Sequence, residues 1–336
     1  MKRTLLYISA AVVSAALITG CSQHSETVKL SGHIIDPETQ EQYDGTLSIL
    51  DGKISRIDKE SVPEDAPFIV QGYADTPIHL ENTLLLPENY AAQAVTEGVI
   101  AAELEYDRIL EVLGEKDGEE FIKSNCSKVH FHFDLQAGKL RKGDNADFIV
   151  VDNLEDRNVL ATYIDGLAVY SNGKVNKDLL VKGEMPRQIP NIFGAGTIST
   201  EDIYTEEEEY NSSSDMVKMV LIDRLGLSDP IVSFVSGTGL RKGAIASSIA
   251  DGTLDITAIG VNDSDIAAAI NLIVEQKGGI VVVSPDDILS LPLPVAGMLS
   301  DLDAGSVLSQ YDKLRDQAVF QGYEFDTFGF DFRGLL

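Results

Sequence analysis

The sequence predicts a mixed α/β protein assembled from three structural parts. Two short β-rich segments, residues 28–66 and 138–181, enclose a segment with helical spacing at residues 67–137. After a polar linker at residues 182–214, residues 215–336 alternate strand-like and helical runs, which is typical of a layered α/β domain. The 336 residues are enough for two or three domains.

The first 21 residues are predicted to be a targeting segment. A basic start, MKR, precedes the apolar run TLLYISAAVVSAALI, which is short for a membrane span. The run ends in ITGC at Cys21, a pattern similar to the bacterial lipobox, in which the cysteine is acylated and becomes the new N-terminus. We therefore expect a lipoprotein anchored to a bilayer of the bacterial cell envelope through Cys21, with residues 22–27 as a tether. An ordinary secretory signal or an uncleaved anchor is the alternative.

The composition excludes some partners. Acidic residues number 54 against 26 basic ones, and the net charge is −28. Nucleic-acid binding needs a basic stripe, and electrostatic binding to anionic lipid needs a basic patch, so neither is expected. Cys126 is the single cysteine beyond Cys21, which excludes an intrachain disulfide in a processed chain.

The two β-rich segments are expected to form one composite β domain. The first reads VKLSGHIIDPETQEQYDGTLSILDGKISRID, with Asp44-Gly45 and Asp51-Gly52 as expected turns. The second contains the strand-like runs DFIVVD, VLATYIDG and LAVYSNG. Each segment is too small for a core of its own, so we expect the two to pack into one sheet system.

Helices and strands are expected in the other two parts. Residues 87–102 and 106–125 have helical spacing, and KVHFHFD at residues 128–134 alternates like a strand. In the last part, MVKMVLIDR, IVSFVSG, ITAIGV and GGIVVVS read as strands. Residues 263–279 and 304–322 read as amphipathic helices, the first with a start signal at Asn262 and a glycine stop.

Three stretches resemble the adenine deaminase family of the amidohydrolase superfamily. GLRKGAIASSIADGTLDITAIGVNDSDIAAAINLIVEQKGGIVVV, followed by LPLPVAGMLSD, resembles the family's C-terminal domain. GKLRKGDNADFIVVDNLEDRNVLATYIDGLAVYSNG is similar to its closing β segment, and GYADTPIHLENTLLLPENYAAQAVTEGVIAA to the start of its barrel. The resemblance implies a divalent metal cofactor (Mn, Fe or Zn) and hydrolytic deamination of adenine to hypoxanthine.

The sequence departs from the family at the metal-ligand positions. His79 and Glu81 match the second metal histidine and the carboxylate after it, but Pro77 stands where the first histidine belongs. Asp107 and Arg108 stand where the family has a metal-type histidine and its neighbouring acid. In the C-terminal domain, two further family histidines align with Asp251 and Leu254. The glycine and apolar framework is kept.

The barrel is also shortened. A (β/α)₈ barrel takes about 250 residues, whereas only about 70 separate the two β segments. The predicted remnant, residues 67–137, has room for two or three βα units and would leave open strand edges. A second copy of the chain, as a homo-oligomer, or another partner could cover such edges.

A replacement metal site is one hypothesis for the remaining histidines. His130 and His132 share one face of the predicted strand, and with His79 and Glu81 they would supply three nitrogens and an oxygen, a set that suits Zn²⁺. The alternative is two half-exposed polar residues on an amphipathic strand. Asp147 and Asp152 are expected to cap turns rather than to act as acids.

Three functions remain open. We expect an adenine deaminase-like protein with impaired or absent activity, because metal catalysis fails without its ligands. The alternatives are an exported lipoprotein that binds a purine, another small molecule or a protein, and a divergent metal-dependent hydrolase.

Overall fold

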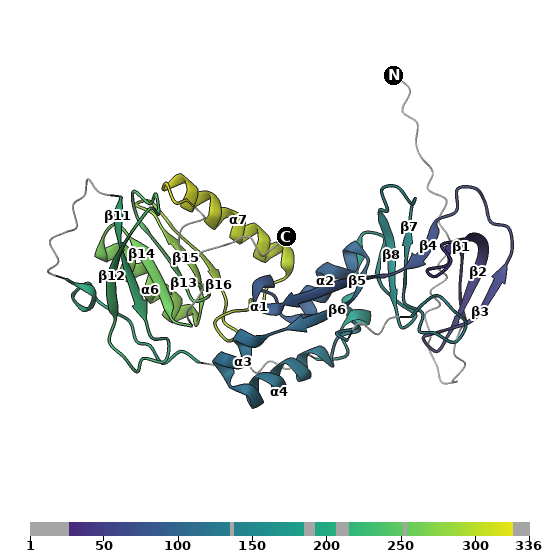
Figure 1. Cartoon of the computed structure of the whole chain (residues 1–336), viewed down its shortest axis with the longest axis horizontal. Helices are drawn as coiled ribbons and strands as arrows, with labels where there is room; N and C mark the ends of the chain where they lie inside the picture. The colour runs from purple at the N-terminus through teal and green to yellow at the C-terminus, as the bar shows by residue number, and fades with distance from the viewer. Residues whose placement is uncertain (1–26, 135–137, 185–191, 206–214, 251–253, 325–336) are drawn as a thin grey trace, which may run out of the picture.

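The computed structural model describes residues 27–134, 138–184, 192–205, 215–250 and 254–324, and it has the predicted mixed α/β architecture. Figure 1 shows an elongated molecule with a β-rich part at one end, the C-terminal α/β part at the other, and a small αβ segment between them. None of the described helices is long and apolar enough to cross a membrane. The predicted signal segment and Cys21 lie outside the described residues.

One eight-stranded sheet contains strands from both β-rich segments. Its order is β10-β9-β8-β7-β4-β1-β2-β3. The strands are β1 (Val28–Ile35), β2 (Gln42–Leu50), β3 (Lys53–Lys59), β4 (Phe68–Gln71), β7 (Phe148–Val151), β8 (Val159–Ile164), β9 (Leu167–Ser171) and β10 (Lys174–Val175). The segments join where β4 pairs antiparallel with β7, while its other edge pairs parallel with β1.

Only one of the two predicted Asp-Gly turns of the first segment exists. Asp51 and Gly52 both have positive φ, as a tight hairpin turn requires, and they connect β2 to β3. The prediction for Asp44-Gly45 is wrong, because both residues lie inside β2 and Gly45 is paired with Gly32 of β1. A side chain at Gly45 would collide with the backbone carbonyl of Asp58, so the glycine permits close strand packing there.

The core of this sheet uses side chains from both segments. Ile34, Leu47 and Ile54 come from the first segment and are fully buried. They share one hydrophobic cluster with Phe148 and Tyr163 of the second segment, whose rings stack with centroids 4.7 Å apart. Neither segment therefore has a complete core without the other.

The middle part is a small parallel sheet flanked by helices. Its elements are β5 (Tyr73–His79), α1 (Leu80–Thr83), α2 (Pro87–Ala94), the 3₁₀ turn η1 (Val95–Glu97), β6 (Val99–Glu105), α3 (Asp107–Leu113) and α4 (Glu115–Cys126). The helix predicted over residues 87–102 ends early, because Gly98 has positive φ and the buried run after it pairs with β5. The strand predicted over residues 128–134 is reduced to isolated bridges at Val129 and His132.

The C-terminal part is a three-layer α/β/α unit. Its sheet, in the order β12-β11-β14-β13-β15-β16, is antiparallel throughout. Figure 1 shows α6 and α7 on opposite faces of this sheet, and each helix has its own hydrophobic cluster. The elements are β11 (Met216–Ile222), β12 (Ile231–Ser236), β13 (Ala244–Ser247), β14 (Ile256–Gly260), α6 (Asp263–Gln276), β15 (Gly279–Val283), β16 (Ile288–Pro292) and α7 (Ala304–Phe320).

Local signals set the ends of the two long helices. The Asn262 side chain accepts a hydrogen bond from the backbone N–H of Asp265, which caps α6 as predicted. Asp303 caps α7 in the same way by accepting from Ser306. Part of the predicted linker belongs to this domain, because Phe193 and Ile203 are buried in the cluster around α6.

The shared core generates a stability prediction. Phe148→Ala should lower the free energy of unfolding by about 3–5 kcal/mol, because it removes a fully buried ring and the stacking contact of that ring with Tyr163. Leu160→Ala is the matched control: Leu160 lies on neighbouring β8 and is 45% exposed, so its loss should cost about 0.5 kcal/mol. Urea unfolding followed by circular dichroism measures both. Equal losses would contradict a core shared by the two segments.

Candidate functional site

The carboxyl end of β5 carries the first predicted metal motif. Pro77 lies in this strand and offers no ligand atom, and His79 ends it with a half-exposed side chain. The Nε2 atom of His79 lies 3.2 Å from the Oε2 atom of Glu105 at the end of β6. Asp75 accepts a hydrogen bond of 3.1 Å from the hydroxyl of Tyr90. Burial and the Asp75 carboxylate raise the pKa of Tyr90 above its ordinary value, so this hydroxyl keeps its proton.

Glu81 follows on α1 and is only 6% exposed. Within the described part of the chain its Oε2 atom has no hydrogen-bond partner. In that same part, a single group of three ligand-type side chains is close enough to share an ion, and this group contains neither Glu81 nor His79. Glu81 is therefore buried next to β5, but it does not form the predicted metal site with His79.

His130 and His132 have different surroundings. The Nδ1 atom of His130 lies 2.5 Å from the backbone carbonyl of Leu179, on α5 (Lys177–Leu180). His132 pairs with Ala101 in the middle of β6, whereas His79 lies opposite Glu105 at its end. Four residues of strand separate these positions by about 13 Å. The structure therefore does not gather His79, Glu81, His130 and His132.

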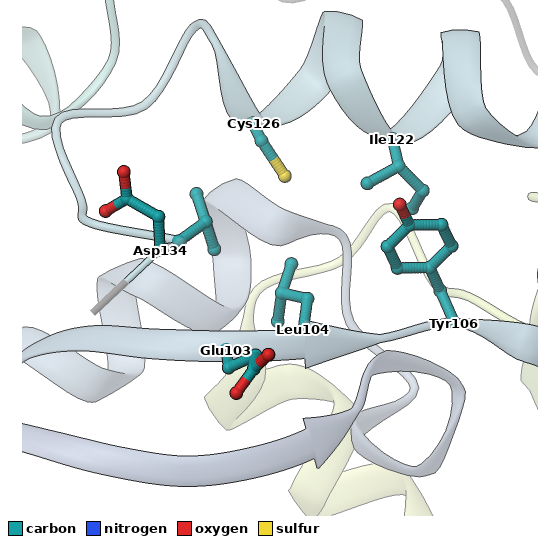
Figure 2. Close-up of a pocket in the computed structure, with 7 residues that line it drawn as sticks. Glu103, Leu104, Tyr106, Ile122, Cys126 and Asp134 are labelled. Carbon is teal, nitrogen blue, oxygen red and sulfur yellow. The ribbon is translucent and has the colours of Figure 1, made fainter. Parts of the chain in front are cut away.

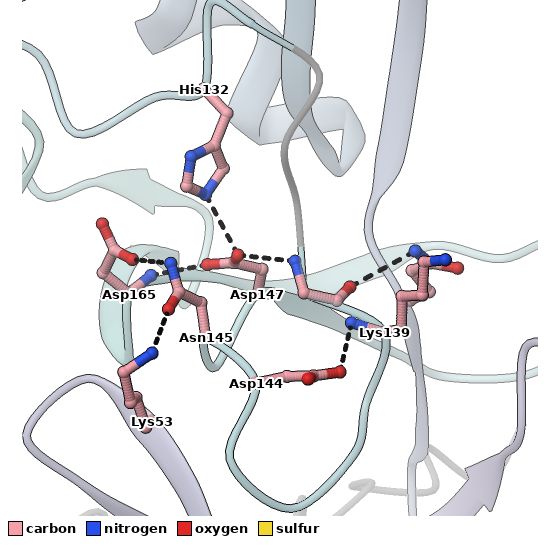
Figure 3. Close-up of polar contacts among 9 residues, drawn as sticks. Lys53, His132, Lys139, Asp144, Asn145, Asp147 and Asp165 are labelled. Atoms are coloured by element: carbon pink, nitrogen blue, oxygen red, sulfur yellow. Dashed lines mark hydrogen bonds and ion pairs between the residues drawn. The ribbon is translucent and has the colours of Figure 1, made fainter.

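His132 instead lies in a partly buried group with two aspartates. The ligand-type atoms of His132, Asp147 and Asp165 are all within 4.8 Å of one another. Figure 3 shows the imidazole of His132 directed at Asp147, with the Nε2 atom 3.1 Å from Oδ2. Asp165 lies in the turn between β8 and β9, and its Oδ1 atom accepts a hydrogen bond of 2.8 Å from Asn145.

Asp147 is the most buried member of this group, with no exposed surface. Its Oδ1 atom accepts from the backbone N–H of Asp165 at 2.7 Å, and its Oδ2 atom accepts from that of Gly138 at 2.8 Å. Burial by itself would raise the pKa of Asp147, but His132 and these two N–H groups lower it below its ordinary value. Burial likewise disfavours the imidazolium, but the Asp147 carboxylate raises the pKa of His132. The pair is therefore held as a buried ion pair.

Arg108 connects the middle part to the C-terminal part. It lies in the first turn of α3, and its two terminal nitrogens donate to the backbone carbonyls of Ile249 (3.3 Å) and Ala250 (3.2 Å). Arg224 donates to carbonyls on both sides of the same loop, those of Ser248 and Leu254. Burial and the nearby Arg108 lower the pKa of Arg224 to about 10, so the Arg224 guanidinium remains charged at neutral pH.

These arrangements do not fit the divalent metal that the family resemblance implies. At β5, Pro77 supplies no donor atom, and His79 has Glu105 as its neighbour. At α3, Asp107 is exposed and Arg108 is directed at backbone carbonyls. Asp251 lies outside the described residues, and at Leu254 the carbonyl accepts from Arg224. A cation such as Arg108 beside a metal would also repel it.

A half-open cavity of about 500 Å³ lies between β6 and α4. Figure 2 shows the thiol of Cys126 and the side chain of Leu104 facing this space, with Tyr106 and Asp134 at its sides and the Glu103 carboxylate on the other side of β6. Burial raises the pKa of Cys126 to about 12, so its thiol is protonated and neutral. The cavity has the size of a small-molecule site, and its mixed lining offers hydrogen-bond acceptors beside apolar surface.

The sequence interpretation missed Asp165 and the role of Asp147. Asp152 caps its turn as predicted, by accepting from the backbone N–H groups of Asn153 and Asn158. Asp147 also accepts backbone N–H groups, but from two separate loops, and it contacts His132. The Asp165-Gly166 dipeptide was a visible turn signal between two strands. Its proximity to His132 depends on strand pairing far apart in sequence.

Comparison with known proteins gives one family. Residues 197–330 match the model of the adenine deaminase C-terminal domain. The chain is 36% identical over 226 residues to an adenine deaminase of Methanosarcina barkeri, an alignment that covers 56% of this chain and 40% of the relative. It is 36% identical over 211 residues to that of Parabacteroides distasonis (55% and 39%) and 38% identical over 205 residues to that of a Sulfurovum species (54% and 38%). The chain spans about 40% of the length of these curated relatives.

The Arg108 contact generates a prediction. Arg108→Met should lower the free energy of unfolding by about 1–3 kcal/mol, because it leaves the carbonyls of Ile249 and Ala250 without their donors. Arg315→Met makes the same chemical change on α7, where Arg315 is 42% exposed and forms surface ion pairs, so it should cost less than about 1 kcal/mol. Chemical denaturation compares the two. A smaller loss of unfolding free energy in Arg108→Met than in Arg315→Met would contradict the inference that Arg108 holds the middle part to the C-terminal part.

Proposed function

We propose that the chain is a member of the adenine deaminase family that binds a small molecule and does not deaminate adenine; the support for the family is the match of residues 197–330 and the 36% identity to the Methanosarcina barkeri protein. The observation that carries the proposal is the contact of Arg108 with the carbonyls of Ile249 and Ala250. A position that the family resemblance assigns to the metal site is here used to hold two domains together. Replacing Arg108 by a metal-binding side chain would remove the two hydrogen bonds that connect α3 to the C-terminal part.

The middle part is proposed to be a remnant of the amidohydrolase barrel. Two parallel strands, β5 and β6, are each followed by helices, and the bridge at His132 adds parallel pairing on the other side of Ala101. Parallel βα units in this order are what the first turns of such a barrel would provide. Among the described residues no strand lies between α4 and β7, so the strands that would carry further ligands and close the pocket have no counterpart there.

Binding without turnover is supported by the cavity between β6 and α4. It lies toward the carboxyl end of β6, where ligands bind in parallel α/β sheets. The Asp134 carboxylate at its side is a hydrogen-bond acceptor and favours a ligand that presents hydrogen-bond donors, as the exocyclic amino group of an aminopurine does. The protonated thiol of Cys126 is a poor nucleophile, which favours non-covalent binding.

The central prediction is that the purified chain does not deaminate adenine. The purified chain should form no hypoxanthine above background over hours, with or without added Mn²⁺, Fe²⁺ or Zn²⁺, as measured by chromatography. Loss of single catalytic groups costs orders of magnitude, and several ligand positions are changed here. Pro77→His alone should not restore activity, because Arg108 and the shortened barrel remain.

The control variant for this assay is His79→Ala. Metal-dependent hypoxanthine formation that disappears in His79→Ala would show the proposal to be wrong and would identify a divergent hydrolase. Equilibrium dialysis against adenine in the same preparation, with Tyr106→Ala as the pocket variant, reports whether the cavity binds the base.

We further propose that the protein is an exported lipoprotein held at the membrane by an acylated Cys21. The support is the order of basic start, apolar run and ITGC in the first 21 residues. Cys21→Ser should block acylation, so that the chain loses its detergent-phase partitioning or keeps its signal segment, as mass spectrometry would show. Unchanged mass and unchanged partitioning in Cys21→Ser would contradict the anchor.

A further inference from the structure

The group of His132, Asp147 and Asp165, in which Asp147 is buried and the other two are partly buried, has the geometry of an ion site. The Nε2 atom of His132 and the Oδ2 atom of Asp147 are 3.1 Å apart, and each of the three residues offers one ligand atom within 4.8 Å of the others. Ligand atoms at about 2.1 Å from one tetrahedral ion are separated by about 3.4 Å, and atoms on opposite sides of an ion by about 4.2 Å. Small rotations of the three side chains would therefore suffice to close them on an ion.

The Nε2 atom of His132 is a second, independent observation. It is enclosed, and despite its short distance to Asp147 it has no partner with hydrogen-bond geometry among the described residues. The two groups are therefore close enough for an ion pair but do not meet the angular requirement of a hydrogen bond. An enclosed imidazole nitrogen beside carboxylate oxygens, without a well-formed hydrogen bond, is in a position to ligate a cation together with them.

The charge of the group points the same way. Two carboxylates face one imidazole, so the group has a negative excess whether or not His132 is protonated. Lys53, a cation of the network in Figure 3, donates to the Oδ1 atom of Asn145 at 2.9 Å. A divalent cation would neutralise this excess in a place where Asp147 has no access to water.

Neighbouring groups already orient both carboxylates. Asn145 donates to Oδ1 of Asp165, and the backbone N–H groups of Asp165 and Gly138 donate to Asp147. A side chain at Gly138 would collide with the carbonyl oxygen of Asn145, so the loop can approach Asp147 only with glycine there. Such supporting hydrogen bonds are what fixes ligands in metal sites.

We propose that His132, Asp147 and Asp165 bind one first-row divalent cation, with Zn²⁺ preferred. One nitrogen and two carboxylate oxygens suit Zn²⁺ or Mn²⁺, and Zn²⁺ is bound more tightly by a given set of such ligands. This site is distinct from the one that the family resemblance implies, since His132 lies about 13 Å along β6 from the end that His79 occupies.

The ion would act as a structural clamp. Its three ligands come from three separate places: the segment paired with β6, the residue before β7, and the β8–β9 turn. It would therefore tie the middle part to the eight-stranded sheet. The proposal does not depend on the absence of deaminase activity, and its test has no activity readout.

The test is metal binding by the full chain, purified in detergent, stripped with EDTA and dialysed. Titration calorimetry with Zn²⁺ should give one site per chain, with weaker binding of Mn²⁺. Asp165→Asn keeps the shape and the turn but removes a charged ligand, and it should weaken Zn²⁺ binding at least about tenfold. His132→Gln should do the same, and Zn²⁺ should raise the thermal unfolding midpoint of the parent chain only.

Two matched histidine controls separate this site from others. His130→Gln and His79→Gln change half-buried and half-exposed imidazoles outside the group and should leave the affinity unchanged. If circular dichroism shows that His132→Gln does not fold, the Zn²⁺ affinity of Asp165→Asn tests the proposal. Absence of stoichiometric Zn²⁺ binding, equal affinity in Asp165→Asn, or a loss of binding in His79→Gln would each overturn the proposal.

Discussion

Asp147 is a carboxylate without solvent exposure, and the joint between the eight-stranded sheet and the middle part is built around it. A buried charge is costly unless hydrogen bonds and an opposite charge compensate it. Here compensation comes from three directions: the Gly138 loop, the β8–β9 turn at Asp165, and His132 beside β6. Because each partner lies on a different element, satisfying this one group fixes how those elements meet.

At the end of the middle part that faces the C-terminal part, the contacts are made by positively charged arginines. Arg108 and Arg224 donate to carbonyls of one loop, and a backbone carbonyl is a partner that the loop provides whatever its side chains are. At Leu254, where the family resemblance places a histidine, the contact with Arg224 uses the backbone carbonyl and does not depend on the side chain. The contacts around Asp147 and those of Arg108 together connect the middle part to the eight-stranded sheet on one side and to the C-terminal part on the other.

The sequence predicted what depends on neighbours in the chain. The Asn262 cap and the Asp51-Gly52 turn need only a few adjacent residues, and both predictions are confirmed. Gly45 failed because a glycine in a strand and a glycine in a turn look alike until the partner strand, with Gly32, is known. The group at Asp147 was not predictable either, since residues 132, 147 and 165 meet only through pairing of β6, β7 and β8.

The same distinction explains why the histidines were grouped wrongly into one hypothesis. Alternation along 128–134 places His130 and His132 on one face only if the segment is a regular strand. Instead, the backbone of His130 donates to Leu180 while that of His132 pairs with β6, so successive contacts go to different elements. A segment whose partner changes from the end of α5 to β6 within a few residues cannot keep strand alternation. The irregularity that separates His130 from His132 is therefore also what allows His132 to reach Asp147.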